Sequence, residues 1–109
     1  MRAMITFALI ALTAQCAIAD EMKSRTIEGK VKSFACGDNC YLTISTPYGG
    51  DIIGLCVARE CGPWNFFTKI PKEYLGKKVA VTVGVGDRID GSGDLIDRAI
   101  AFTSVTFLH

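Results

Sequence analysis

Four cysteines lie close together near the middle of the chain, at Cys36, Cys40, Cys56 and Cys61. Neighbouring cysteines can hold structural zinc, form a redox-active pair or form disulfide bridges. Their spacings are C-x3-C and C-x4-C, which match neither the C-x-x-C of redox pairs nor the commonest zinc knuckles. The fifth cysteine, Cys16, lies in an N-terminal segment with the features of a signal peptide, described below, so the domain that remains has four. An even cysteine count in a short exported chain is typical of a disulfide framework. The sequence therefore predicts two structural bridges and no metal site.

The pairing of the cysteines depends on the register of the hairpin around residues 47–50, because four cysteines allow three pairings. A hairpin centred on Tyr48 places Cys40 opposite Cys56. A hairpin centred between positions 48 and 49 aligns the apolar side chains better, Leu42 with Leu55 and Ile44 with Ile53. This second register favours two local bridges, Cys36–Cys40 and Cys56–Cys61, which we expect over the other pairings.

Three aromatic residues follow the last cysteine, at Trp64, Phe66 and Phe67. Exposed rings could stack on a sugar or a base, whereas buried rings would close the open end of a β-barrel. Large aromatic side chains dominate the energetics of protein cores. We therefore expect the three rings to plug the barrel, and we keep Trp64 as a weaker candidate for contacting a ligand.

An acidic stretch near the C-terminus contains Asp87, Asp90, Asp94 and Asp97, and closely spaced carboxylates can bind calcium. An EF-hand loop starting at Asp90 would need glycine at its sixth position and glutamate at its twelfth. Those positions hold Leu95 and Ala101. The stretch is therefore expected to be a solvated hairpin loop.

Catalysis has little support in the sequence, because the single histidine is the last residue, His109. No Ser-His-Asp or Cys-His arrangement can be drawn. A nuclease on an exported barrel would need arginines beside acidic metal ligands, and the arginines available near the acidic stretch are Arg59, Arg88 and Arg98. Their spacing follows no metal-dependent pattern, so we expect a protein that is not an enzyme and that needs no cofactor.

Residues 1–19 have the features of a signal peptide. Arg2 provides the positive charge, an apolar run follows, and Ala17-Ile18-Ala19 is a small-x-small cleavage site. The apolar run is shorter than the about 20 residues that span a bilayer. We expect one domain of 90 residues, 20–109, in the bacterial periplasm or outside the cell, with no membrane insertion after the signal is removed.

The charge of the domain is balanced once residues 1–19 are removed, with 11 Lys and Arg against 11 Asp and Glu. Nucleic-acid binders carry a clear basic excess, so the composition argues against a nucleic-acid partner. The overall balance likewise gives no reason to expect attachment to anionic lipid.

From Thr26 onward the chain follows β patterns, with alternating residues that predict strands over 27–34, 41–46, 51–57, 77–85 and 96–108. Pro71 and Gly76 are typical of the start and end of a short helix. A polar loop over 87–94 joins the last two strands, and a change of phase predicts a β-bulge at Thr103–Ser104.

Three meandering strands, a helix-bearing insertion and two further strands form the order of an OB-fold, an all-β, five-stranded Greek-key barrel. Gly29 in the first strand and the late bulge supply the curvature that a barrel needs. The alternative is an immunoglobulin-type sandwich, which ordinarily has about seven strands in about 100 residues.

The layout of the chain resembles that of the small periplasmic bacterial OB-fold proteins. The resemblance rests on the signal peptide and on four segments of the domain, GKV at 29–31, YLTI at 41–44, GKKVAVTVGV at 76–85 and AFTSVTFL at 101–108. It covers most of the domain. It implies an OB-fold with a non-catalytic binding or stress-related role, and it implies no catalytic residue.

OB-folds commonly bind ligands on a face formed by the second and third strands. Tyr41 and Thr43 lie on the outward face of the second predicted strand, and Tyr48 lies in the turn that follows. With Trp64, these residues are the candidate ligand contacts. We expect an exported binding module whose partner is a protein, a peptide or a saccharide. The alternative is a small secreted inhibitor or virulence-associated factor that binds a protein.

Overall fold

The structure is a computed structural model that describes residues 25–108, so the predicted signal peptide lies outside the described residues. Five strands are present, β1 (Arg25–Cys36), β2 (Cys40–Ser45), β3 (Asp51–Cys56), β4 (Lys78–Ile89) and β5 (Leu95–Phe107). Three short helical segments lie between β3 and β4, the 3-10 turn η1 (Arg59–Cys61), the helix α2 (Gly62–Phe67) and the 3-10 turn η2 (Lys72–Tyr74).

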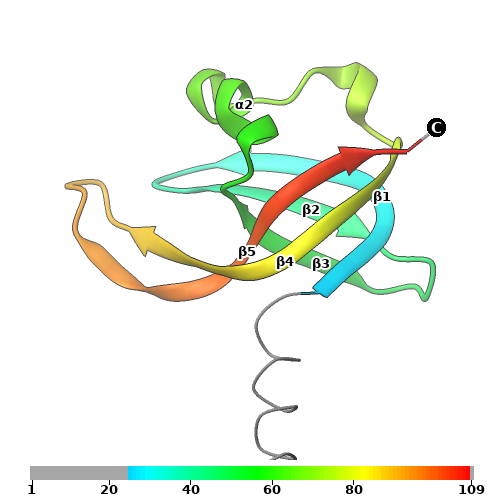
Figure 1. Ribbon diagram of the computed structural model, residues 1–109. Coiled ribbons are helices and arrows are strands. Elements are labelled where there is room, and N and C mark those ends of the chain that lie inside the picture. Colours follow the sequence, from blue (N-terminus) through cyan, green and yellow to red (C-terminus); the bar gives the residue numbers. More distant parts are fainter. Residues whose placement is uncertain (1–24, 109) are drawn as a thin grey trace, which may run out of the picture.

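The strands form a closed barrel in the order β1-β2-β3-β5-β4 (Figure 1). The pairs are antiparallel except for β3 and β5, which run parallel where Leu55 meets Ala101 and Cys56 meets Phe102. This confirms the predicted OB-fold-like barrel with a short helix between the third and fourth strands. The immunoglobulin-type alternative is wrong, because a single sheet closes on itself instead of two sheets packing face to face.

The core lies inside this barrel and follows the predicted alternation. Leu42 and Ile44 of β2, Val79 and Val81 of β4 and Phe102 of β5 are fully buried. The neighbouring positions of β2 point outward and are only half-buried. The period of two along each strand therefore decides which side chains fill the barrel.

The predicted register between β2 and β3 is wrong by one residue. Leu42 pairs with Gly54 instead of Leu55, and Ile44 pairs with Ile52 instead of Ile53. Gly54 faces inward because the ring of Phe102 occupies the space beside it, and a Cβ at position 54 would lie 3.0 Å from that ring. A pattern of apolar residues does not mark a glycine as a core position, although Gly54 makes room for Phe102, the largest of the fully buried side chains among the described residues.

The short helix predicted between Pro71 and Gly76 is present as a single 3-10 turn, and the α-helix that precedes it was not predicted. The α-helix is α2, with Pro63 in its first turn, and Pro71 precedes only the single 3-10 turn η2. Gly76 does follow η2, with a positive φ of 83°. Both prolines can begin a helical turn. The one near Cys61 and Trp64 begins the longer helix because those two side chains are buried in the barrel and hold the segment in place.

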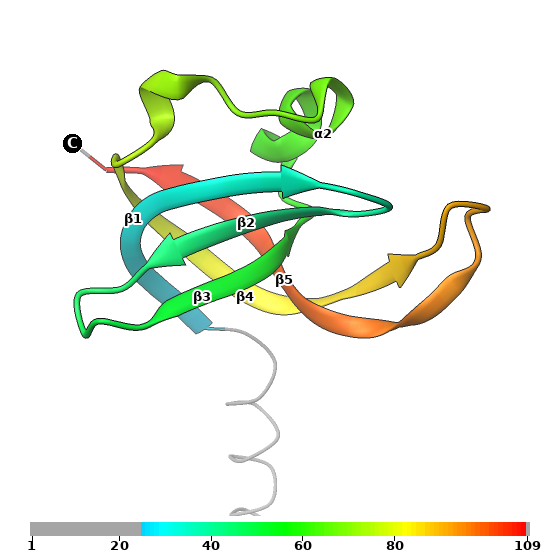
Figure 2. The same cartoon turned by 180° about the vertical axis from the view of Figure 1, so that it is seen from behind.

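The last two strands extend beyond the barrel as a curved hairpin, residues 84–100, which we call the arm (Figures 1 and 2). The predicted loop over 87–94 is too long, because β4 continues to Ile89 and β5 begins at Leu95. The predicted bulge is confirmed: Thr82 pairs with Ser104 and Val83 with Phe102, so Thr103 is the extra residue.

Gly29 lies next to Lys30, where the pairing of β1 passes from β4 to β2. We expect Gly29→Ala to destabilise the domain. An added Cβ would clash with the backbone carbonyl of Ser45 and lie 2.6 Å from a methyl of Ile44. Overfilling of this kind typically costs about 1–3 kcal/mol. Urea denaturation measures the change in the free energy of unfolding. Gly37→Ala is the control, since nothing lies within 4 Å of a Cβ there, and equal stability of the two variants would contradict the packing at position 29.

Candidate functional site

The structure contains both local disulfides, Cys36–Cys40 and Cys56–Cys61. The predicted pairing is therefore confirmed, although the register from which it was argued is wrong. Cys36 and Cys40 face each other across the β1–β2 turn. Cys56 ends β3, and the fully buried Cys61 ends η1. The second bridge therefore fixes the start of the helical insertion against the barrel.

The helical insertion, residues 57–77, covers one end of the barrel, and we call it the cap (Figure 1). Hydrogen bonds join the cap to the barrel at two places. The side-chain amide of Asn65 donates a hydrogen bond of 2.8 Å to the carbonyl of Cys56. Thr68 ends α2 in the left-handed conformation, with φ 57°. On the far side of the cap, the amide of Gly76 donates to the carbonyl of Val31.

Trp64 is the residue of the cap that enters the barrel end, and only 6% of it is exposed. Its ring packs against three other aromatic rings. Phe34 and Phe107 lie at 6.2 Å and 6.1 Å in edge-to-face geometry, and Tyr74 lies at 5.5 Å. Tyr74 and Phe107 stack at 4.8 Å. These four rings close the end of the barrel, so Trp64 takes the plugging position expected from the sequence.

Phe66 and Phe67 do not join this plug, and for them the expectation is wrong. Phe66 is 81% exposed and Phe67 is 64% exposed. Their rings contact each other edge to face at 5.1 Å. A six-residue helix can turn only one narrow face toward the barrel, and Trp64 occupies that face. The two phenylalanines therefore lie on the solvent side of α2.

A groove of about 660 Å³ opens between α2 and η2 on the outer side of the plug. Its wall is almost entirely aromatic and proline, and we call it the aromatic groove. Its lining is Glu60, Pro63, Trp64, Phe67, Lys69, Pro71, Tyr74 and Phe107. Lys69 and Glu60 supply the only charges of the lining, and the ammonium of Lys77 lies 5.4 Å from the centre of the Tyr74 ring. An apolar concave wall with a few polar groups at its edge is the usual form of a ligand site.

The outward face of β2 and β3, where ligand contacts were predicted, is partly covered by the arm. Tyr41 is half-buried and lies against Arg88 of the arm. Leu55, on the same face, is buried, and one of its methyl groups would lie 3.4 Å from a Cβ at Gly86. Thr43, the next outward position of β2, is half-buried.

Tyr48 lies in the β2–β3 turn, beyond the far end of β2 from Tyr41, and is 96% exposed. The structure therefore does not bring Tyr41, Thr43 and Tyr48 together into one surface, and Trp64 lies apart from them in the cap. Of the four predicted ligand contacts only Trp64 lines the aromatic groove, and the rest of the groove was not predicted. The only sign of it in the sequence is the pair of prolines, Pro63 and Pro71, on either side of the aromatic run.

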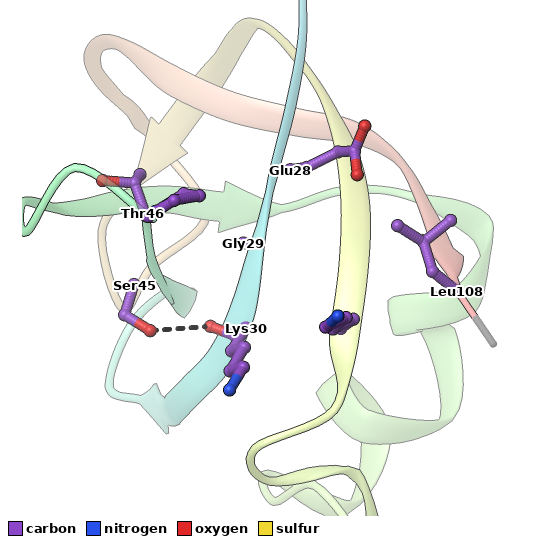
Figure 3. A pocket seen from close by; sticks show the side chains of 8 residues that line it. Glu28, Gly29, Lys30, Ser45, Thr46 and Leu108 are labelled. Carbon is purple, nitrogen blue, oxygen red and sulfur yellow. Dashed lines mark hydrogen bonds between the residues drawn. The ribbon is translucent and has the colours of Figure 1, made fainter.

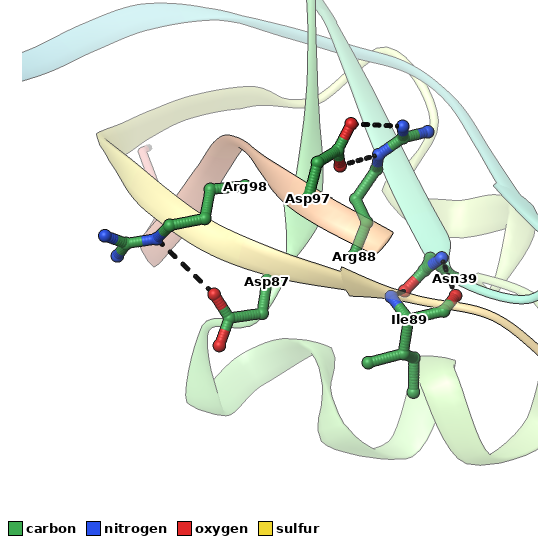
Figure 4. A network of polar contacts seen from close by, with 6 residues as sticks. All are labelled: Asn39, Asp87, Arg88, Ile89, Asp97 and Arg98. Carbon is green, nitrogen blue, oxygen red and sulfur yellow. Dashed lines mark hydrogen bonds and ion pairs between the residues drawn. The ribbon is translucent and has the colours of Figure 1, made fainter. Parts of the chain in front are cut away.

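The arm is held in shape by two ion pairs across its strands and by one side chain from the β1–β2 turn (Figure 4). The guanidinium of Arg88 donates two hydrogen bonds to Asp97, of 2.6 Å and 2.7 Å. Arg98 lies 3.4 Å from Asp87. Asn39 donates to the carbonyl of Ile89 at 2.8 Å and accepts from its amide at 3.1 Å. The pKa of Asp97 is lowered by the hydrogen bonds from Arg88.

The four aspartates of the acidic stretch are divided between these pairs and the turn of the arm. The carboxylate of Asp90 accepts hydrogen bonds from the amides of Ser92 and Asp94 and from the Ser92 hydroxyl, at 2.9–3.0 Å. Asp90 therefore shapes the turn. Arg88 and Arg98, considered for a nuclease site, are held in ion pairs. Within residues 25–108 no group of three or more His, Cys, Asp or Glu side chains could hold a metal ion.

Asp90 should make stability depend on pH. The Ser92 hydroxyl is the main cause of its lowered pKa, and the amide of Asp94 adds to it. A carboxyl with a lower pKa in the folded state stabilises the fold above its unfolded pKa of about 3.9, and this contribution is lost as pH falls through the folded pKa. We expect Asp90→Asn, which retains the acceptor oxygen, to flatten the fall in melting temperature between pH 6 and pH 2. An unchanged pH profile would contradict the role of this carboxylate.

A second depression, of about 490 Å³, lies beside β1 and the end of β2 (Figure 3). Its charged lining residues are Glu28, Lys30 and Lys78. Figure 3 shows Glu28 and Lys30 pointing in different directions, and the hydrogen bond drawn runs from the Ser45 hydroxyl to the backbone carbonyl of Lys30. The charged groups do not converge on one point, so this depression offers less to a ligand than the aromatic groove.

No helix within residues 25–108 is both long and apolar enough to cross a bilayer. Comparisons with protein families, with curated proteins and with solved structures give no match.

Proposed function

We propose that this protein is an exported, non-catalytic binding module of OB-fold type that holds an apolar segment of a protein partner in the aromatic groove. The observation that carries the proposal is the groove itself. It is formed by four aromatic rings and two prolines, and the Cys56–Cys61 bridge fixes the segment that builds it. A partner therefore meets a preformed wall, which lowers the entropic cost of binding.

A protein segment suits this wall better than a saccharide does. Sugars are bound by rings together with several hydrogen-bonding side chains. The polar side-chain groups of this lining are Glu60, Lys69, the hydroxyl of Tyr74 and the indole N–H of the nearly buried Trp64, and the rest is carbon surface. Extended proline-rich or apolar segments dock into aromatic-lined grooves through their side chains. The groove and its rim therefore favour a peptide with apolar residues.

Two features of the chain support the proposal that this binding module is exported. The small-x-small site at Ala17-Ile18-Ala19 and the two disulfides in a short domain agree with a periplasmic or secreted protein. We expect the mature chain to begin at Asp20. Intact-mass measurement of protein purified from its native host tests this, and a product that retains Met1 would contradict the export of a processed domain.

Trp64 makes binding measurable, because it is the single tryptophan and lines the groove. Peptides selected from a random phage-displayed library on the domain should change the Trp64 emission on titration. Phe67→Ser should weaken that binding at least tenfold, since Phe67 forms part of the wall. Ile100→Ser on the arm, a position of similar exposure, is the matched control and should bind as the unmodified domain does. Peptides that bind without changing Trp64 emission, and equally to both variants, would contradict the groove as the site.

A further inference from the structure

The exposed pair Phe66 and Phe67 is the largest aromatic surface that the cap turns to solvent. The two rings contact each other at the end of α2, and Leu75, 45% exposed, lies further along the same cap. Figures 1 and 2 show α2 and η2 together on one side of the barrel. Exposed apolar side chains that form one contiguous patch mark sites of contact with a protein or a membrane.

The charges around this pair are not balanced, although those of the whole domain are. The cap, residues 57–77, contains four basic side chains, Arg59, Lys69, Lys72 and Lys77. The same stretch contains two acidic ones, Glu60 and Glu73. The compensating acidic residues lie elsewhere, four of them in the arm and its turn at positions 87–97. The cap therefore carries a net positive charge together with two exposed aromatic rings.

We propose that the cap docks the domain peripherally on an anionic phospholipid membrane. Phe66 and Phe67 enter the headgroup region, and the flanking Lys69 and Lys72 face lipid phosphates. Aromatic rings with lysines beside them are the composition that lies at membrane interfaces. Charge complementarity favours an anionic membrane as the partner. Basic side chains next to the inserted rings strengthen binding to an anionic bilayer and contribute little to binding a neutral one.

This docking requires no spanning segment and goes beyond the binding of a peptide in the groove. Phe66 is not part of the groove lining, so the two activities can be separated by substitution. Each lysine near an anionic surface contributes about fivefold to the partition coefficient, and this contribution weakens with added salt. The two rings, once inserted, also strengthen binding to the membrane, because their apolar surface is removed from water.

The test is co-sedimentation of the domain with vesicles of phosphatidylglycerol and phosphatidylcholine, beside vesicles of phosphatidylcholine alone. We expect binding to the anionic vesicles that falls at high salt, and at least tenfold weaker partition to the neutral ones. Two double variants should each lower the partition at least tenfold. One combines Phe66→Ser with Phe67→Ser, and the other combines Lys69→Glu with Lys72→Glu. Ile100→Ser should leave partition unchanged, and thermal melting checks that every variant is folded.

Absence of sedimentation with anionic vesicles, or equal partition of all variants, would overturn the membrane proposal. A domain that binds a protein partner through Phe66 yet ignores vesicles would also overturn it. The single variant Phe66→Ser separates the two proposals. It should weaken vesicle binding and leave the change of Trp64 emission on peptide titration unchanged. If the domain does not bind vesicles, the proposal of peptide binding in the groove still stands. If it does not bind peptides, the proposal of membrane docking still stands.

Discussion

Trp64→Ala is expected to lower the free energy of unfolding by about 3–5 kcal/mol, the usual cost of deleting a large buried aromatic side chain. The indole contacts Phe34, Tyr74 and Phe107, and the cap covers the barrel end mainly through this ring. A single domain has only about 5–15 kcal/mol of stability. The variant should therefore melt far below the unmodified protein and should be poorly expressed.

Chemical denaturation of the domain under oxidising conditions measures this change. Phe66→Ala is the matched control, because Phe66 lies two residues away in the same helix and is 81% exposed. Its effect should stay within about 0.5 kcal/mol, as for most surface substitutions. Equal losses for the two variants, or an unperturbed melt for Trp64→Ala, would contradict the plug.

Removal of the Cys56–Cys61 bridge is the second large effect that we expect. Closing a loop this short stabilises a domain by about 2 kcal/mol through the unfolded state. Both sulfur atoms lie in residues that are buried in the core, so Cys56→Ala with Cys61→Ala also leaves space there and should cost more than the loop term alone.

Cys36→Ala with Cys40→Ala is the matched control, because that bridge closes a loop of similar length between residues that are only half-buried. Urea denaturation of both double variants should show a larger loss for the Cys56–Cys61 pair. The aromatic groove should also lose its shape in that variant, since the bridge fixes the start of the cap. Equal losses would mean that the buried sulfur atoms add nothing beyond loop closure.

The strand pattern predicted the barrel because alternation reports directly on which side chains fill the interior, as Leu42 and Ile44 do. The register between β2 and β3 was harder to predict from the sequence. The inward position of Gly54 depends on the ring of Phe102, which comes from a strand almost fifty residues later. A pattern of apolar residues does not identify a glycine as a core residue. The predicted pairing of β2 with β3 was therefore wrong by one residue.

The groove could not be predicted for a related reason. Trp64, Phe66 and Phe67 are alike in the sequence, and only the direction of a six-residue helix decides that the first is buried and the other two are exposed. Tyr74 and Phe107 join Trp64 through tertiary contacts between the cap and β5. The predicted β2–β3 site depended on tertiary contacts in the same way, since Arg88 of the arm lies against Tyr41.

Site-specific photocrosslinking in the native host tests the central claim, that the aromatic groove is the partner site, most directly. A photoreactive phenylalanine analogue is placed at Lys69, on the groove, or at Thr43, on the β2–β3 face predicted from the sequence. Irradiation should yield a discrete crosslinked protein adduct from position 69 and none from position 43. An adduct from position 43 with none from position 69 would contradict the account and return the site to the outward face of β2 and β3.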